Sequence, residues 1–252
     1  MQRTRFIFAL GILAIAGALH ASTFGFSTPA GAQTIGVNGD PLAASAIFTV
    51  SANTITITLN NLEANPTTDA QVLDALTFQL NGQTIPGGAT INLSMSETKF
   101  IKVTNGGSDP QTSATLSWNL SDQVTGSTVD FSFCNAIVTG TNCTSAGTDA
   151  PAGGIIGAAA SNNKYTNADS TIRGSSANPY IFEDASFAIT MSSGTFNLNQ
   201  SNYTNLLFGY GDTTNEYEAV GGVAPEPSSF WMIAAALALG LAAFPYRHKL
   251  RA

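Results

Sequence analysis

Histidine is almost missing from this 252-residue chain, since His20 and His248 are the only two and they lie near opposite ends. The long stretch between them therefore contains no imidazole. Serine and cysteine hydrolase triads use histidine as their general base, and the common zinc sites use it as a ligand. Both kinds of site are excluded for the central part of the chain. The sequence predicts a protein that is not an enzyme and that needs no cofactor.

Positive charge is also scarce. Residues 33–224 contain four cations, Lys99, Lys102, Lys164 and Arg173, against fifteen acidic residues, so their net charge is 4 − 15 = −11. A surface of this sign repels phosphate backbones, which excludes nucleic acid as an expected partner.

The amino terminus has the pattern of a secretory signal peptide. Arg3 and Arg5 precede an uncharged apolar stretch, Phe6–Leu19, which matches the charged and apolar parts of such a peptide. The stretch is shorter than the roughly 20 apolar residues that a permanent membrane helix needs. The sequence therefore predicts export.

Two places offer the small residues that signal peptidase recognises. Ala30-Gly31-Ala32 has small residues at both recognised positions, so we expect the cut between Ala32 and Gln33 and assign residues 1–32 to the signal peptide. Ala21 is a second candidate, which lies closer to the apolar stretch but has Leu19 at the outer recognised position.

The chain has only two cysteines, Cys134 and Cys143, which flank a short polar loop. An even number of cysteines in an exported protein predicts a disulfide, and two free buried thiols are the alternative. Closing so short a loop stabilises a fold by roughly 2 to 3 kcal/mol in the chain-entropy model. No cysteine directly follows the signal region, which argues against a lipoprotein anchor there.

Hydrophobic residues alternate with polar ones over most of residues 33–220. Ile55, Ile57 and Leu59 alternate with threonines, and the same period of two recurs along the chain. The other runs with this pattern centre on 48–50, 91–96, 101–103, 114–120, 129–133, 187–191, 196–198 and 206–210. Short half-buried strands separated by turns predict an all-β fold, an antiparallel β-sandwich of jelly-roll or immunoglobulin-like type.

We call residues 33–220 the body of the protein, and two of its segments depart from the pattern. Residues 70–76 are the only ones that we expect to make a helical turn. Residues 143–177 are poor in large apolar side chains and rich in Gly, Ala, Ser and Asn, which predicts a long surface excursion.

The last 28 residues carry the most specific signal in the chain. Residues 221–224 read as a flexible linker, and Pro225-Glu226-Pro227 follows them as a stiff, extended tripeptide. The apolar residues 230–246 are 17 in number, near the lower limit for a transmembrane helix. The cations that follow hold the carboxyl terminus in the cytoplasm: Arg247, Lys249 and Arg251.

The tripeptide, the apolar run and the basic end, in this order, resemble the PEP-CTERM sorting signal of exported bacterial proteins. Pro245, late in the apolar run, is a mild departure from that pattern. The resemblance implies anchoring in the inner membrane, cleavage at or near Pro225-Glu226-Pro227 by an exosortase, and transfer to the cell surface or beyond. It also implies a Gram-negative bacterium that makes exopolysaccharide. An ordinary uncut membrane anchor is the alternative.

Some residues of the body are candidates for ligand binding. Sugar rings stack on exposed aromatic side chains, and four tyrosines lie in polar loop sequence: Tyr165, Tyr180, Tyr203 and Tyr217. Trp118 falls on the apolar side of its run, where we expect it to pack in the core.

Acidic residues suggest two other sites. Asp212, Glu216 and Glu218 are weak calcium candidates, because they lack the acidic spacing and the fixed glycine of a dedicated calcium loop. Glu183 and Asp184 are adjacent, and a glycosidase needs two carboxylates at a suitable separation. Neighbouring residues of a strand point to opposite faces, so surface solvation is the better interpretation of this pair.

These observations predict an exported cell-surface or extracellular-matrix protein with a structural or adhesive role. A carbohydrate-binding module for exopolysaccharide is the first alternative, and a glycan-degrading enzyme with an acid pair is the second. The expected partners are signal peptidase, an exosortase, the inner membrane during sorting, and exopolysaccharide.

Overall fold

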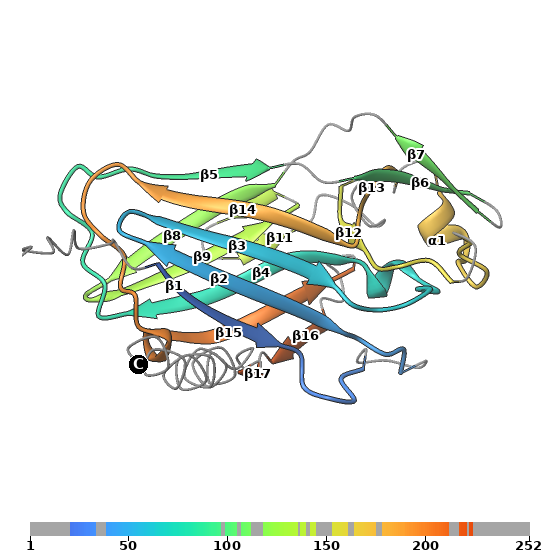
Figure 1. Cartoon of the computed structure of the whole chain (residues 1–252), viewed down its shortest axis with the longest axis horizontal. Coiled ribbons are helices and arrows are strands. Elements are labelled where there is room, and N and C mark those ends of the chain that lie inside the picture. The colour runs from blue at the N-terminus through green and yellow to red at the C-terminus, as the bar shows by residue number, and fades with distance from the viewer. Residues whose placement is uncertain are drawn as a thin grey trace, which may run out of the picture.

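The described residues form two large β-sheets that pack face to face, together with a separate two-stranded sheet (Figure 1). The structure is a computed structural model that describes residues 21–33, 39–96, 99–104, 107–111, 118–135, 137–139, 142–144, 153–160, 164–174, 178–211, 217–220 and 222–223. The predicted all-β fold is confirmed for these residues.

The first sheet has six antiparallel strands and lies at the front of Figure 1. In spatial order these strands are β17 (Gly222–Val223), β1 (Ser22–Ser27), β2 (Ala44–Ser51), β3 (Thr54–Asn61), β14 (Asp184–Met191) and β5 (Ile91–Ser96). Strands β2 and β3 form a hairpin that is in register over its whole length, from Ala44 opposite Asn61 to Ser51 opposite Thr54.

The second sheet lies behind the first and branches at β4. Its main path is β16 (Tyr217–Val220), β15 (Tyr203–Tyr210), β4 (Leu73–Asn81), β12 (Ile155–Ile156), β13 (Tyr180–Phe182), β6 (Phe100–Thr104) and β7 (Gly107–Gln111). Two strands pair with the same edge of β4. Leu73, at its start, pairs with β12, and residues 75–81 pair with β9 (Thr128–Cys134). β8 (Asn119–Thr125) extends the β9 branch, and β12 and β13 are parallel to each other.

The remaining elements are short. They are the hairpin of β10 (Ile137–Thr139) and β11 (Asn142–Thr144), the helix α1 (Ser170–Arg173) and the single 3-10 turns η1 (Asp69–Gln71) and η3 (Gln200–Asn202).

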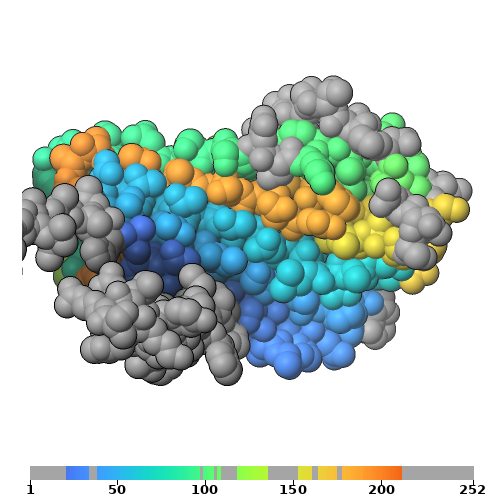
Figure 2. Space-filling model, in the orientation of Figure 1, coloured from blue at the N-terminus to red at the C-terminus, as the bar shows by residue number. Residues whose placement is uncertain are grey.

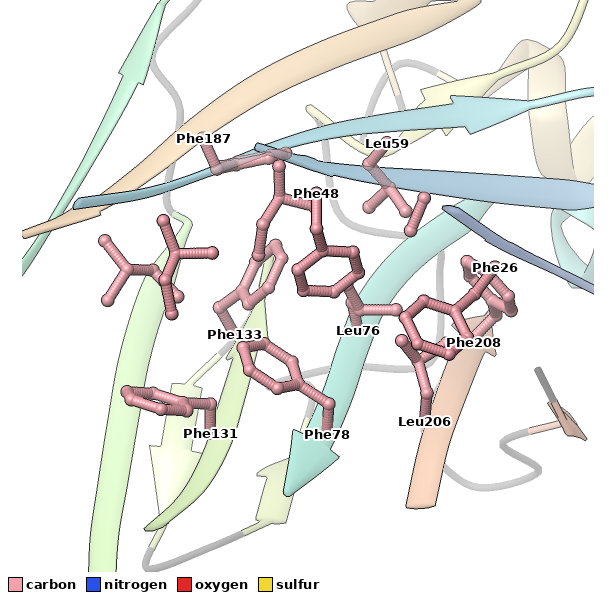
Figure 3. Packing of buried hydrophobic residues seen from close by; sticks show 14 of the residues in the cluster. Phe26, Phe48, Leu59, Leu76, Phe78, Phe131, Phe133, Phe187, Leu206 and Phe208 are labelled. Atoms are coloured by element: carbon pink, nitrogen blue, oxygen red, sulfur yellow. The ribbon is translucent and has the colours of Figure 1, made fainter. Parts of the chain in front are cut away.

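The main core fills the space between the sheets. Successive side chains of a strand point to opposite faces of its sheet, so the alternating apolar residues all point inward. Figure 3 shows Phe48 of the first sheet facing Phe78 of the second, and their ring centroids are 5.2 Å apart. Phe133 and Phe187 meet in the same way at 5.0 Å. Trp118 is partly buried and packs against this core as predicted, with its ring centroid 4.6 Å from that of Phe187.

Several of the strands that the sequence predicts are present, whereas the strand predicted at 196–198 is absent. The runs at 54–59, 91–96 and 129–133 coincide with β3, β5 and β9. The run at 196–198 is an irregular segment, in which Phe196 is buried and Leu198 is exposed. Residues 114–117 of the run at 114–120 lie outside the described residues, and β8 begins at Asn119.

The interpretation of residues 143–177 as a surface excursion is wrong for its described parts. β12 lies inside the second sheet, and both of its isoleucines are fully buried. A second, smaller core gathers around this segment, and its buried members are Val72, Ile101, Val103, Ile156, Tyr165, Ala168, Ile172 and Tyr180. Residues 70–76 are also only partly as expected, because the helical turn ends at Gln71 and strand β4 starts at Leu73.

Both ends of the body differ from the expected boundaries. The sheet begins with β1 at Ser22, inside the segment 1–32 assigned to the signal peptide. Residues 221–224, expected to be a flexible linker, contain strand β17, which pairs with Phe26 and Ser27 of β1.

Candidate functional site

Three of the four tyrosines expected to bind sugars are buried, so that prediction is wrong for them. The exposed fractions of Tyr165, Tyr180 and Tyr203 are 1%, 0% and 3%. A sugar ring stacks on an aromatic face that solvent can reach, and these rings offer none. Tyr217 lies in β16, and its side chain is outside the described part of the structure.

Each of these buried tyrosines donates its hydroxyl proton to a backbone carbonyl of a neighbouring segment. The acceptors are Gly157 O at 2.8 Å for Tyr165, Ile172 O at 3.1 Å for Tyr180 and Asn197 O at 3.1 Å for Tyr203. Buried polar groups need such partners, and the bonds tie irregular segments to the cores. Burial raises the pKa of the Tyr165 hydroxyl, and the nearby Glu183 raises it further; burial alone raises the pKa of Tyr203.

Asp184 is the first residue of β14 and Glu183 directly precedes it, and both are exposed. The backbone of Glu183 has a φ of 68°, a conformation that is uncommon outside glycine. Two backbone hydrogen bonds hold it there, from Glu183 N to Ile156 O at 2.8 Å and from Asn61 N to Glu183 O at 2.9 Å. This residue therefore connects β3, β12 and β14 through its backbone.

A buried polar cluster lies where the loop after β3 meets β12 and the turn η1. Asn61 is 3% exposed, and its side-chain amide donates to Gln71 O and to Ile155 O, both at 2.8 Å. Its Oδ1 accepts a hydrogen bond from Glu63 N at 3.0 Å. Gln71 in turn accepts from Thr67 N at 2.7 Å and donates to Pro41 O at 3.0 Å. These bonds fix three loops to one another.

Glu63 and Tyr210, which lie in this region, both have raised pKa values. Partial burial raises the pKa of the Glu63 carboxyl, and the charge of Asp40 raises it further. Burial raises the pKa of the Tyr210 hydroxyl, with a further contribution from Glu63. The Tyr210 hydroxyl is buried and has no hydrogen-bond partner within the described structure. No sequence pattern indicates this grouping of Asp40, Glu63 and Tyr210, because the three residues are far apart in the chain.

Metal binding finds no support in the described residues, where no group of three or more His, Cys, Asp or Glu side chains comes close enough to hold an ion. Of the weak calcium candidates, Asp212 and Glu216 lie outside the described residues. Glu218 lies in β16 opposite Gly209 of β15, and its side chain is not described.

The two cysteine-bearing segments lie beside each other. Cys134 is the last residue of β9 and is buried, and Cys143 is the middle residue of β11, which packs against β9. The side chain of Cys143 is outside the described part, so the disulfide between Cys134 and Cys143 stays a prediction.

The outer face of the first sheet, over β2, β3 and β14, faces the viewer in Figure 2. The side chains that these strands direct outward are nearly all uncharged. Outward residues align across the strands, as in the row Thr23, Thr49, Thr56, Ala188 and Ser94. Most outward residues of β1, β2, β3, β14 and β5 are Ser, Thr or Asn, and Asp184 is the only charged one. Ile47 is the large apolar exception, at 45% exposed.

The residues expected to direct sorting lie outside the described structure. These are Pro225, Glu226 and Pro227, the apolar residues 230–246 and the cations Arg247, Lys249 and Arg251. No helix within the described ranges has the length and apolar character that a membrane span requires. Ala32 and Gln33, at the expected signal cut, are described and directly follow a turn at residues 30–31. Ala32 O accepts a hydrogen bond from Leu42 N at 2.9 Å, and Gln33 forms an isolated antiparallel β-bridge with Pro41.

No protein-family model matches the chain, and neither the curated proteins nor the solved structures contain a match to it.

Proposed function

We propose that this chain is an exported cell-surface or extracellular-matrix protein with a structural or adhesive, non-catalytic role. Its body is a β-sandwich of jelly-roll or immunoglobulin-like type, and its tail is a sorting signal that an exosortase cuts at Pro225-Glu226-Pro227. The observation that carries the proposal is the order of the tail: tripeptide, apolar run of 17 residues, basic end.

The features of the body are compatible with this role. Its described tyrosines serve the cores, and its one adjacent acid pair, Glu183 and Asp184, is bound into the framework through the backbone of Glu183. The broad outer face of Ser, Thr and Asn side chains offers many hydrogen-bonding groups and little charge. Such a face suits extensive contact with a hydrated matrix better than selective binding of a small molecule.

Sorting is tested by intact-mass measurement on the protein recovered from the cell surface and medium. The mature chain is expected to end near Pro225 to Pro227. Glu226→Ala should leave a membrane-bound chain with its basic end intact, whereas Ser228→Ala, two residues away, should be processed normally. Extracellular protein that retains Arg251 would contradict the proposal.

The non-catalytic role needs a separate test, which uses the purified extracellular protein. Incubation with a panel of polysaccharides should release no shorter glycans, and cells lacking the protein should attach less well to a surface than cells that make it. Glycan release that disappears in Glu183→Gln or Asp184→Asn would instead establish the acid-pair enzyme.

A further inference from the structure

Strand β1 is a full member of the first sheet. It pairs with β2 along its entire length, from Ser22 opposite Val50 to Ser27 opposite Ser45. On its other edge Phe26 and Ser27 pair with β17. β1 is therefore enclosed by two strands, and one of them comes from the opposite end of the body.

The inward side chains of β1 belong to the main core. Phe24 and Phe26 are 3% and 6% exposed, although they lie near the start of the described chain. The ring of Phe24 stacks on Phe48 at 5.6 Å and lies 4.8 Å from Tyr203, which belongs to the second sheet. Phe24 thus helps to join the two sheets.

A cut between Ala32 and Gln33 would remove all of these contacts. It would expose one edge of β2, uncover the rings of Phe48 and Tyr203, and leave β17 without its partner. Unpaired sheet edges and exposed aromatic clusters promote aggregation, which an extracellular protein must avoid. The folded body needs the residues that this cut discards.

We infer that signal peptidase cuts the chain between Ala21 and Ser22, so that the mature protein begins with the first residue of β1. The inference rests on the proposed export. Water adds across the Ala21–Ser22 peptide bond, leaving a carboxylate on Ala21 and an ammonium group on Ser22. Ala21 has the small side chain needed before the cut and lies two residues after the apolar stretch Phe6–Leu19, where signal peptides end.

The amino terminus of the exported protein is the direct test. Intact mass and amino-terminal sequencing should give Ser22 as the first residue. Ala21→Leu should abolish or displace the cut, whereas Ala32→Leu should leave Ser22 first. An exported chain that begins at Gln33 would overturn the inference and leave the proposed function standing. A chain that keeps both Met1 and Arg251 would overturn the proposed function and, with it, this inference.

A second test asks whether β1 is present in the mature fold. Phe24→Asp places a charge in the core, whereas Thr23→Asp places the same charge on the exposed face of the same strand. The exported Phe24→Asp protein should be digested at least about tenfold faster than wild type by added protease, because proteolysis follows the population of opened molecules. The Thr23→Asp protein should resemble wild type. Equal digestion of both variants would overturn the inference, because a cut before Gln33 removes both residues.

Discussion

Glu63 has a carboxyl group whose surroundings disfavour its charged form. Its backbone N–H is bonded to Asn61, and its side chain lies near Asp40 and the buried Tyr210 hydroxyl. Loss of hydration and a neighbouring negative charge both disfavour the ionised carboxylate. The surrounding hydrogen bonds of Asn61 and Gln71 keep the loop in place despite this cost.

The raised pKa of Glu63 makes the stability of the protein depend on pH. Because the folded-state pKa lies above the ordinary glutamate pKa of 4.5, the folded protein binds more protons than the unfolded chain between the two pKa values. Stability should therefore fall as the pH rises from 4.5 through the folded-state pKa. Glu63→Gln should remove this part of the pH dependence and raise stability at pH 7.

Urea unfolding at several pH values between 4 and 8 checks this prediction. Asp40→Asn should have a smaller effect in the same direction, because the charge of Asp40 is the second cause of the shift. If the unfolding free energy of Glu63→Gln changed with pH as steeply as that of wild type, Glu63 would not be the cause of the pH dependence.

At the scale of elements, the contact between β12 and the loop after β3 depends on a glycine. Gly157 follows β12 directly, and a Cβ atom added there would lie 1.8 Å from the backbone oxygen of Glu63. The oxygen belongs to the backbone, so a side-chain rotation cannot relieve the clash. The two segments approach as closely as they do because this position has no side chain.

Gly157→Ala should therefore destabilise the protein by about 1 to 3 kcal/mol, the usual range for overpacking. Gly87→Ala is the matched control, because no atom lies within 4 Å of the added Cβ and its φ is not in the left-handed region. Thermal unfolding of both variants measures the difference. An equal melting temperature in the two variants would show that the loop moves away freely.

The sequence predicts the long half-buried strands well and the short or isolated elements poorly. β3, β5 and β9 follow from their period of two, because each has one apolar and one polar face. β12 has only two residues in a stretch rich in Gly and Ala, so no period can be detected. β1 has the same alternation, with Phe24 and Phe26 between smaller residues, but its position beside the apolar stretch led to its assignment to the signal peptide.

The candidate sites were harder to predict than the fold. Tyr165, Tyr180 and Tyr203 lie in polar local sequence, which favours a loop exposed to solvent. Their burial depends on carbonyl groups of other segments and on strands distant in sequence, which a local pattern does not contain. The grouping of Asp40, Glu63 and Tyr210 likewise arises only when β15 pairs beside β4.

At the scale of the whole molecule, the two sheets share one core and should unfold together. Phe48 of β2 is central to it, since its ring contacts Phe24 and Phe26 of its own sheet and Phe78 and Tyr203 of the other. Within the part of the chain that the structure describes, the first sheet has no core of its own, because its inward residues belong to the same cluster as those of the second sheet.

Phe48→Ala should destabilise the protein by about 3 to 5 kcal/mol, the usual cost of removing a buried Phe side chain. Ile47→Ala, the adjacent residue at 45% exposed, should change stability by less than about 0.5 kcal/mol. Trp231 lies in the tail that the proposed cut would remove, so Trp118 would be the only tryptophan of the mature protein and its fluorescence would report on the core that it packs against. Denaturant transitions followed by this fluorescence and by far-UV circular dichroism should coincide; separate midpoints would show that the sheets unfold independently.

The short pairing of β17 with β1 also determines how the molecule responds to force. Tension applied at the carboxyl-terminal end of the body first loads the two register pairs that join β17 to β1. Peeling these two residues away lengthens the tether by about 7 Å, at roughly 3.3 Å for each residue. Only then does the load reach β16, whose four register pairs hold it to β15. Strand β17 is therefore expected to detach from β1 before the other strands of the two sheets carry the load.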